Sequence, residues 1–302
     1  MLHSAWTHNP DATFYLLDCG ISSDSRRLLK KFAEEQNIRL GLKRVRTEAL
    51  GNLPTHRWAA ATYARLLIPQ VLPSSCEKAL YIDADCIIAA SLSQFWSLDI
   101  SKHLFAAVLD EKGRDSEREH GGLQDCPQFA NAGVLLMNLV AWRAEKFGDR
   151  AIDYGRRNTL VHADQTAINA LAQGRVVLVP EIWNYMLSYE RVFDGSPVKP
   201  SIIHFTGVRK PWLHSDELFA AIYLYHRNRT PFAIGDLRFR YRSRLRFALN
   251  LLVLRRTYWR RLRFSLHYER TFTAPYLEKM REPAVELTPY RAPSEEGAGA
   301  AR

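Results

Sequence analysis

The chain has 302 residues, enough for one large domain or two smaller ones with a substantial core. Its hydrophobic content of 47% and charged content of 25% are ordinary for a globular protein. It has no stretch of about 18 uncharged apolar residues and no signal-peptide pattern at its start, so we expect no membrane-spanning helix. The four cysteines share no Cys-x-x-Cys spacing, which argues against zinc or a disulfide framework and fits a reducing cytoplasm.

The net charge of +10 is concentrated in one segment. Residues 235–270 contain eleven Arg, no Lys, one Asp and one Glu, a net of +9, which leaves +1 for the rest of the chain. The main domain therefore need not bind a polyanion. No nucleic-acid motif accompanies the arginines, and we expect no nucleic-acid partner.

Short apolar runs alternate with helical patterns along most of the chain. Strands are expected over residues 13–18, 38–45, 79–82, 105–109, 134–138, 175–180 and 201–205. Helices are expected over residues 24–37, 58–67, 142–154, 166–172 and 216–228. This alternation predicts an α/β fold with a mostly parallel sheet flanked by helices.

The segment from Glu111 to Gln128 is polar and contains three glycines. It predicts a long mobile loop, and loops of such length are usually lids or binding loops. The chain has no Gly-x-Gly-x-x-Gly fingerprint, so a dinucleotide-binding fold of the usual kind is unsupported.

Two carboxylates, Asp83 and Asp85, directly follow the apolar strand that ends at Ile82. Buried carboxylates are costly unless something positive pairs with them. Their Asp-x-Asp spacing lets both reach one hard divalent cation. The motif is weak alone, because a capped turn with two solvated carboxylates fits it equally well.

Further polar residues stand at the ends of other predicted elements. They are Asp110, Asn131 and His204 at strand ends and Asp164-Gln165 at the start of a helix. In a parallel sheet such residues would lie at one edge, where α/β proteins bind ligands. Each also has an ordinary structural role, such as a helix cap or a turn residue. Only their joint arrangement favours a site.

This edge could hold a divalent metal between Asp83, Asp85 and His204. Carboxylates with one imidazole suit manganese and tolerate magnesium. Lys210 could meet a phosphate as a point charge, and Gly207 allows a ligand to approach the backbone closely. The composition is that of a metal–diphosphate site.

Five blocks of the sequence, in order, resemble glycosyltransferase family 8. They are Thr62–Leu66, Tyr81–Asp85, Asn131–Leu135, His162–Gln165 and His204–Trp212. This family contains retaining enzymes, among them bacterial lipopolysaccharide galactosyl- and glucosyltransferases and glycogenin. The resemblance covers roughly residues 4–226, and five blocks in order are highly specific. It implies a GT-A fold, in which a nucleotide-binding α/β sheet is merged with an acceptor-binding part.

The resemblance also implies roles for individual residues. Asp83 and Asp85 match the manganese-binding pair, and His204 matches the third protein ligand. The positions matched to the nucleotide sugar are Arg65, Asp83, Asp85, Asn131, Ala132, Gly207 and Lys210. Those matched to the reacting sugar are Asp110, Asp164 and Gln165, with Gln165 beneath the anomeric carbon.

The implied reaction moves galactose or glucose from a UDP-sugar to a lipopolysaccharide or other cell-surface glycan. Manganese and Lys210 would stabilise the charge on the departing UDP. The Gln165 carboxamide is a poor nucleophile, and Thr166 stands where relatives often carry an acid. We therefore expect front-face attack by the acceptor hydroxyl, with the leaving phosphate taking its proton.

Three regions are expected: a GT-A domain over 1–235, an Arg-rich amphipathic helical segment over 236–280 and a disordered tail over 281–302. In the middle region apolar residues from Phe247 to Leu262 follow one helical face and arginines surround it. Such a helix is typical of binding to an anionic membrane surface, here the inner face of the membrane. A helix packed on the main domain with its charges in water is the alternative.

Met1 falls within the expected first helix, after the position of the family's first strand, so the chain is shortened relative to the family pattern. Two functional classes follow. One is a metal-dependent retaining hexosyltransferase. The other is a truncated or non-catalytic family member that binds membrane or partners through its Arg-rich segment.

Overall fold

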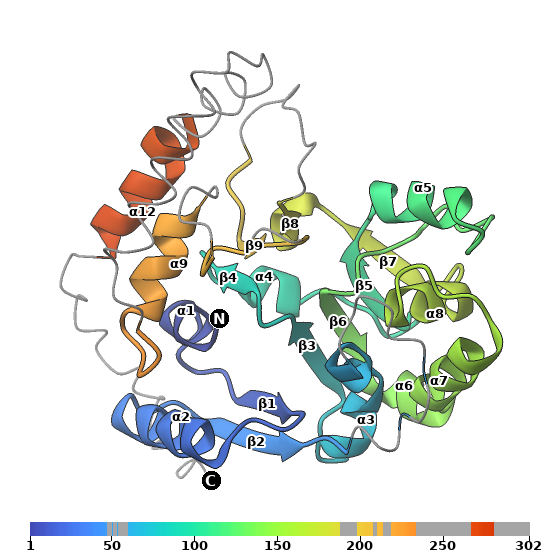
Figure 1. Ribbon diagram of the computed structural model, residues 1–302, viewed down its shortest axis with the longest axis horizontal. Coiled ribbons are helices and arrows are strands. Elements are labelled where there is room, and N and C mark those ends of the chain that lie inside the picture. The colour runs from blue at the N-terminus through green and yellow to red at the C-terminus, as the bar shows by residue number, and fades with distance from the viewer. Residues whose placement is uncertain are drawn as a thin grey trace, which may run out of the picture.

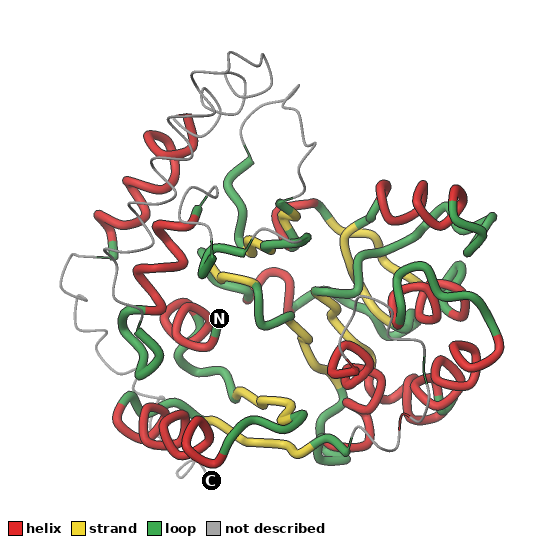
Figure 2. The backbone as a smooth tube through the Cα atoms, viewed as in Figure 1, coloured by secondary structure: helices red, strands yellow, loops and turns green. Residues whose placement is uncertain are grey.

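The computed structural model describes residues 1–46, 50, 53, 60–187, 198–207, 210–213, 219–233 and 267–280. Within these ranges the chain folds into three small sheets with helices packed around them (Figures 1 and 2). None of the helices in these ranges combines the length and apolar character needed to cross a membrane. All four cysteines are free thiols.

The N-terminal part forms a two-stranded parallel sheet. Its elements are α1 (Leu2–His8), β1 (Phe14–Asp18), α2 (Ser23–Glu35) and β2 (Leu40–Arg44). Asp18 at the end of β1 accepts hydrogen bonds from the backbone N–H groups of Gly20 and Ile21, both at 2.9 Å. The Ser22 hydroxyl then caps α2 by accepting from the Ser25 N–H at 3.2 Å. Polar side chains thus fix the turn that the sequence predicted here.

The central sheet has four strands in the order β3-β6-β5-β7. They are β3 (Lys78–Ile82), β6 (Val134–Asn138), β5 (Phe105–Val108) and β7 (Val176–Val179). Alternate residues of β6 face opposite sides: Leu135 and Met137 pack in one core, and Val134 and Leu136 in another. A short third sheet joins β4 (Cys86–Ile88), β9 (Ile202–His204) and β8 (Tyr185–Met186).

One face of the central sheet is covered by a layer of helices (Figure 1). They are the 3₁₀ helix η2 (Ala60–Leu67) with α3 (Ile68–Val71), α6 (Leu139–Ala144), α7 (Phe147–Arg157) and α8 (Asp164–Leu171). Phe105 and Phe147 are fully buried there, each worth about 1.5–3 kcal/mol of hydrophobic stabilisation. The opposite face packs against α1, β4 and α4 (Ser93–Trp96).

A third core lies beside β9 and joins distant parts of the chain. It contains residues of α9 (Ala220–Arg227), the π-helical turn η4 (Glu269–Thr273) and α12 (Ala274–Lys279). The predicted Arg-rich helix falls largely on residues 234–266 and the predicted tail on residues 281–302. Both lie outside the described residues.

The mixed α/β fold is confirmed, but the parallel share was overestimated. The described strands make three parallel and three antiparallel pairings. Because β6 runs against β3 and β5, its first residues lie where those two strands end. Asn131, which precedes β6, therefore reaches the same edge as Asp83 and Asp110, which follow β3 and β5. Antiparallel pairing produces the convergence that the sequence analysis attributed to parallel strands.

The prediction of a mobile loop over residues 111–128 was wrong for its first half. Residues Glu111–Glu119 form α5, which is capped by Asp110 accepting from the Gly113 N–H at 2.9 Å. The helix has no apolar face, and its buried side chain is the carboxylate of Glu117. The expected helix over 142–154 is divided into α6 and α7 at Lys146, whose φ is 49°.

Candidate active site

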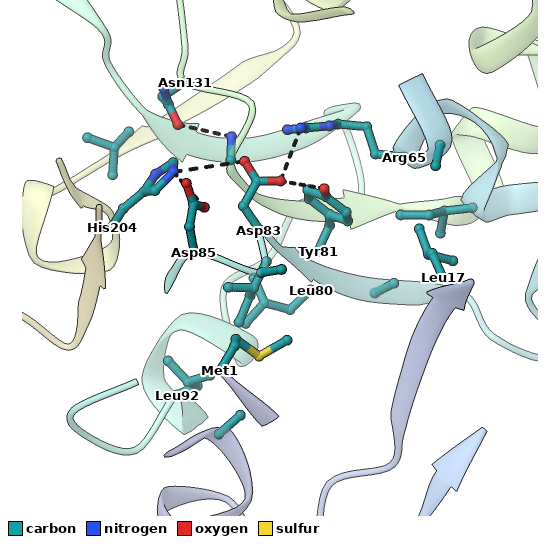
Figure 3. Close-up of a pocket in the computed structure, with 18 of the residues that line it drawn as sticks. Met1, Leu17, Arg65, Leu80, Tyr81, Asp83, Asp85, Leu92, Asn131 and His204 are labelled. Atoms are coloured by element: carbon teal, nitrogen blue, oxygen red, sulfur yellow. Dashed lines mark hydrogen bonds and ion pairs between the residues drawn. The ribbon is translucent and has the colours of Figure 1, made fainter. Parts of the chain in front are cut away.

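One large cavity of about 2360 Å³ lies where β3 ends and β6 begins (Figure 3). The predicted site residues that line it are Arg65, Asp83, Asp85, Asp110, Asn131, Asp164, Gln165, His204, Gly207 and Lys210. Ala132 contributes through its backbone instead: its N–H donates to Gln165 Oε1 and its carbonyl accepts from Arg65. The cavity also extends along β1 and β3, past Leu17 and Leu80. The fold therefore brings together every residue that the sequence assigned to the site.

The three predicted metal ligands come from two different sheets. His204 Nε2 lies 3.3 Å from Asp85 Oδ1 and 3.9 Å from Asp83 Oδ2. Gly133 makes this approach possible, because a Cβ there would lie 2.2 Å from His204 Cε1 and 2.9 Å from Asp83 Oδ2. The donor set of two carboxylates and an imidazole suits manganese or magnesium. The chemistry of these donors fits a divalent metal. Among the described residues the ligand atoms of Asp85, Cys86 and His204 lie within 4.8 Å of one another, and Asp83 joins them through its contact with His204.

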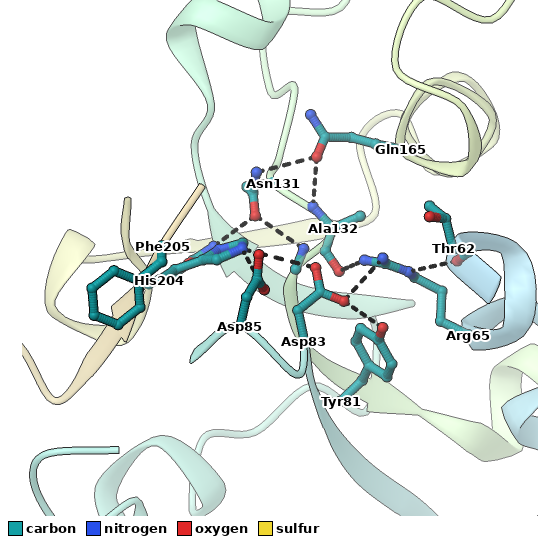
Figure 4. Close-up of polar contacts among 12 residues, drawn as sticks. Thr62, Arg65, Tyr81, Asp83, Asp85, Asn131, Ala132, Gln165, His204 and Phe205 are labelled. Carbon is teal, nitrogen blue, oxygen red and sulfur yellow. Dashed lines mark hydrogen bonds and ion pairs between the residues drawn. The ribbon is translucent and has the colours of Figure 1, made fainter. Parts of the chain in front are cut away.

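The orientation of His204 follows from a chain of hydrogen bonds that starts at the backbone (Figure 4). The Gly133 N–H donates to Asn131 Oδ1 at 2.9 Å, and Asn184 Nδ2 donates to the same oxygen at 2.9 Å. Asn184 Oδ1 therefore faces His204 Nδ1, at 2.9 Å. Because this oxygen only accepts, Nδ1 carries a proton, and Nε2 is the nitrogen that faces the aspartates. Metal-binding histidines are typically oriented in this way.

One carboxylate oxygen of Asp83 is held by hydrogen bonds from neighbouring side chains, and the other faces His204. Its Oδ1 accepts from Arg65 Nη2 at 3.0 Å and from the Tyr81 hydroxyl. Arg65 is buried and also contacts Asp164 Oδ2 through Nε at 2.9 Å. Burial would lower the pKa of Arg65, but the charges of Asp164 and Asp83 raise it above its ordinary value. Arg65 is thus a fixed cation between two acidic groups.

Asp164 has an environment unlike those of Asp83 and Asp85. Burial raises its pKa to about 7, with Arg65 acting in the opposite direction and Asp83 reinforcing the shift. Its side chain is nearly inaccessible to water. It therefore supports Arg65 from inside the fold and does not present a free carboxylate to the cavity.

Asp85 forms the link to the predicted phosphate contact. Its Oδ2 accepts from Lys210 Nζ at 2.5 Å, and the same ammonium donates to the Phe205 carbonyl at 2.6 Å. Burial opposes ionisation of Asp85, but hydrogen bonding to His204 and the charge of Lys210 hold its pKa well below the usual range. Gly207 nearby has a φ of 79°, a conformation that favours glycine.

The Gln165 carboxamide also lines the cavity, and hydrogen bonds fix both of its polar atoms. Its Oε1 accepts from the Ala132 N–H at 2.9 Å and from Asn131 Nδ2 at 3.2 Å. Its Nε2 donates to Asp110 Oδ2 at 3.0 Å. Asp110 also accepts from Asn131 Nδ2 at 3.1 Å. Gln165, Asp110 and Asn131 therefore form one network whose backbone anchor fixes the orientation of each amide.

Two residues of the site were missed by the sequence analysis. Tyr81 lies two residues before Asp83, so the period of a strand places both side chains on one face, and this signal was available. Asn184 lies just after the 3₁₀ turn η3 (Glu181–Trp183), in a segment without a recognisable motif. It contacts Asn131, 53 positions away, and only the fold reveals that contact.

Comparison with known proteins shows similarity in both sequence and fold. A family model described as "Glycosyl transferase family 8" matches residues 1–216. The chain is 26% identical to the lipopolysaccharide 1,2-glucosyltransferase of Escherichia coli over 230 residues, which cover 70% of this chain and 67% of that protein. It is 25% identical to general stress protein A of Bacillus subtilis over 224 residues, which cover 67% of this chain and 77% of that protein.

Among solved structures, the galactosyltransferase LgtC in complex with donor and acceptor sugar analogs is similar in fold, with a TM-score of 0.67 at 23% identity. The superposed region covers 78% of this chain and 91% of that one. A putative glycosyltransferase of Haemophilus influenzae is 28% identical over 66% of this chain and 63% of its own length.

Proposed function

The chain belongs to glycosyltransferase family 8 and has its GT-A fold, and from this premise we propose that it transfers galactose or glucose from a UDP-sugar to a glycan acceptor with retention of configuration. The observation that carries the proposal is that Asp83, Asp85 and His204 Nε2 lie together beside Lys210. Gln165 lines the same cavity. Carboxylates, imidazole and ammonium together suit a metal-bound diphosphate.

The metal ligands would be Asp83, Asp85 and His204, with manganese as the preferred ion and magnesium as the alternative. When bound, the metal supplies Lewis-acid stabilisation of the charge that develops on the departing diphosphate. Lys210 adds a fixed positive charge at the same place, and the Gly207 backbone lets the phosphates approach. Asn184 keeps the proton of His204 on Nδ1, so that Nε2 remains a ligand.

Retention requires either a nucleophile below the sugar ring or attack from the face of the leaving group. The hydrogen bonds of Gln165 occupy both atoms of its amide, and Asp164 is buried against Arg65. Neither offers a free nucleophile, which supports front-face attack by the acceptor hydroxyl with proton transfer to the leaving phosphate. A glycosyl-enzyme detected by intact-protein mass spectrometry would overturn this mechanism.

The acceptor we propose is a lipopolysaccharide or another cell-surface glycan. Its support is the name of the Escherichia coli relative, a lipopolysaccharide glucosyltransferase, together with the family match. The donor hexose we propose is galactose or glucose, and Gln165 and Asp110, which hydrogen-bond to each other, would lie beside it.

The proposal is tested first by binding and then by turnover. UDP should raise the unfolding temperature in the presence of Mn²⁺ and have little effect in EDTA. UDP release is then measured with UDP-galactose and UDP-glucose. If no UDP-sugar stabilises the protein and none is turned over, a non-catalytic role in membrane or partner binding becomes the better explanation.

We also propose that the Arg-rich segment attaches the protein to the inner, cytoplasmic face of the membrane. The support is the sequence pattern alone, since residues 234–266 lie outside the described part of the chain. Sedimentation with anionic but not with neutral vesicles at low salt is the expected result. Equal sedimentation with both kinds of vesicle would contradict it.

A further inference from the structure

The carboxylate of Glu117 on α5 is fully buried, with a relative exposure of 0%. A charged side chain is rarely buried to this extent unless it is paired. Glu117 Oε1 accepts from His162 Nδ1 at 3.0 Å and from the Thr166 hydroxyl, and Oε2 accepts from the Leu123 N–H at 3.1 Å. Burial opposes its ionisation, yet the hydrogen bonds from these groups keep the pKa of Glu117 below its ordinary value.

The two side chains that Glu117 binds flank a strained turn. Ala163, between them, has φ 51° and ψ −127°, which is unusual for a residue with a Cβ. Such a conformation costs on the order of 1–3 kcal/mol and persists only where the surroundings hold it. The next two residues are Asp164 and Gln165. The strained peptide therefore directly sets the position of both predicted sugar-site residues.

The turn is closed on itself as well as fixed to α5. The His162 N–H donates to Thr166 Oγ1 at 2.9 Å, and the Gln165 N–H donates to the His162 carbonyl at 3.1 Å. Thr166 in turn donates its hydroxyl proton to Glu117. One buried carboxylate thus holds both ends of the turn through His162 and Thr166.

Asp110 joins the start of α5 to the same turn. Its Oδ1 caps the helix at Gly113, and its Oδ2 accepts from Gln165 Nε2. Beyond the helix, Gly122 lets the chain fold over the carboxylate, since a Cβ there would lie 1.8 Å from Glu117 Oε2. The helix α5 is therefore joined to the sugar-site turn at both of its ends.

We propose that Glu117 is a positioning residue, which holds the turn from His162 to Thr166 in the conformation that places Asp164 against Arg65 and presents Gln165 to the donor sugar. This inference rests on the proposed glycosyl transfer for its catalytic consequence. Glu117 has no exposed surface, so it acts through the turn and not on the substrate. The proposed metal and diphosphate contacts are on Asp83, Asp85, His204 and Lys210, none of which is a described hydrogen-bond partner of Glu117.

The test compares Glu117→Gln with Glu119→Gln, an exposed glutamate on the same helix. In the first variant kcat for UDP release should fall about 10- to 100-fold, because displacement of a reacting group by about 1 Å can cost that much. The KM for the UDP-hexose should change little, because the metal and phosphate contacts remain. The control should match the wild type.

A second variant separates positioning from folding. Thr166→Val removes only the hydroxyl that Glu117 accepts from and should lower kcat in the same direction. It serves as the test if Glu117→Gln does not fold.

Hydrogen exchange of the peptide over residues 160–171 gives a readout that does not depend on turnover. Exchange there should be faster in Glu117→Gln than in the control. If the wild type releases no UDP, the proposed function fails while the exchange result still tests the turn. Unchanged exchange, or a kcat equal to that of the control, would overturn the inference. So would a loss of kcat that only follows loss of folded protein.

Discussion

Two of the buried histidine networks in the described part of this protein differ in whether their polar atoms are all paired with one another. The first surrounds His204 in the cavity. The second, which we call the histidine cluster, contains His3 and His8 of α1, His226 of α9 and Tyr276 of α12. In the cluster His3 Nδ1 lies 2.8 Å from His226 Nδ1, and the Tyr276 hydroxyl lies 2.6 Å from His226 Nε2 and 2.9 Å from His8 Nε2. Figure 1 shows the three helices side by side.

The partners of each network explain the difference. Among the described residues, the cluster's hydrogen bonds run between imidazoles and hydroxyls, so its polar atoms satisfy one another. Burial, with Arg229 and Lys279 nearby, lowers the pKa of His3 and His8 to about 4. The rings stay neutral and hold α1 against α9 and α12. His204 instead has carboxylates before its Nε2. A buried histidine therefore indicates a ligand site when its second ring nitrogen faces acidic oxygens at a cavity.

The largest expected effect is that of Asp85→Asn in the cavity. It removes one anionic ligand and the partner of Lys210, and should lower UDP release about 10²- to 10³-fold, the usual range for loss of one electrostatic contact at a reacting centre. The measurement is initial rate at saturating Mn²⁺ and UDP-hexose. More than a tenth of wild-type activity in the variant would contradict the metal assignment.

Asn184→Leu should weaken the same site from outside the ligand set. Without the amide oxygen, the His204 proton is no longer held on Nδ1, and Mn²⁺ affinity should fall about 10- to 100-fold. Affinity is measured as the Mn²⁺ concentration that gives half of the UDP-induced thermal shift. Asn158→Leu, at an exposed asparagine, is the control and should leave that concentration unchanged.

Acid should act on the histidine cluster through stability. Its histidines have folded-state pKa values below the unfolded value of 6.5, so the unfolded chain binds more protons between about pH 6.5 and 4. The stabilisation is complete above pH 6.5 and is lost as pH falls through this window, by on the order of a few kcal/mol. Urea unfolding at pH 7, 5.5 and 4.5 measures it. His3→Gln should make the free energy of unfolding less dependent on pH over this range.

The smallest effect is expected for Tyr276→Phe. Loss of the hydroxyl leaves His8 and His226 without one partner and should cost about 1–3 kcal/mol of unfolding free energy. Because Tyr276 is not among the residues that line the cavity, kcat and KM for the UDP-hexose should stay at wild-type values. Loss of activity without loss of stability in this variant would contradict the purely structural role assigned to the histidine cluster.

Local sequence patterns were sufficient to predict the type of most elements and to propose a chemistry for the site. Periodicity located the strands that end at Ile82 and Val108, and block order gave the family, which the family model confirms. The residue types of Asp83, Asp85, His204 and Lys210 pointed to a metal and a phosphate. The inferences about the family and the element types succeeded because they depend on local pattern, and the metal and phosphate assignments stay predictions from side-chain chemistry.

Only the tertiary structure decided how those residues meet. It reversed the direction of β6, formed α5 from a polar segment and placed Arg65 between two acids. It also supplied Asn184 and Glu117, whose side-chain partners lie 20 or more positions away in the chain. Local sequence sets which face of an element is apolar, but the hydrogen-bond partners of a buried polar group are set by packing between distant segments.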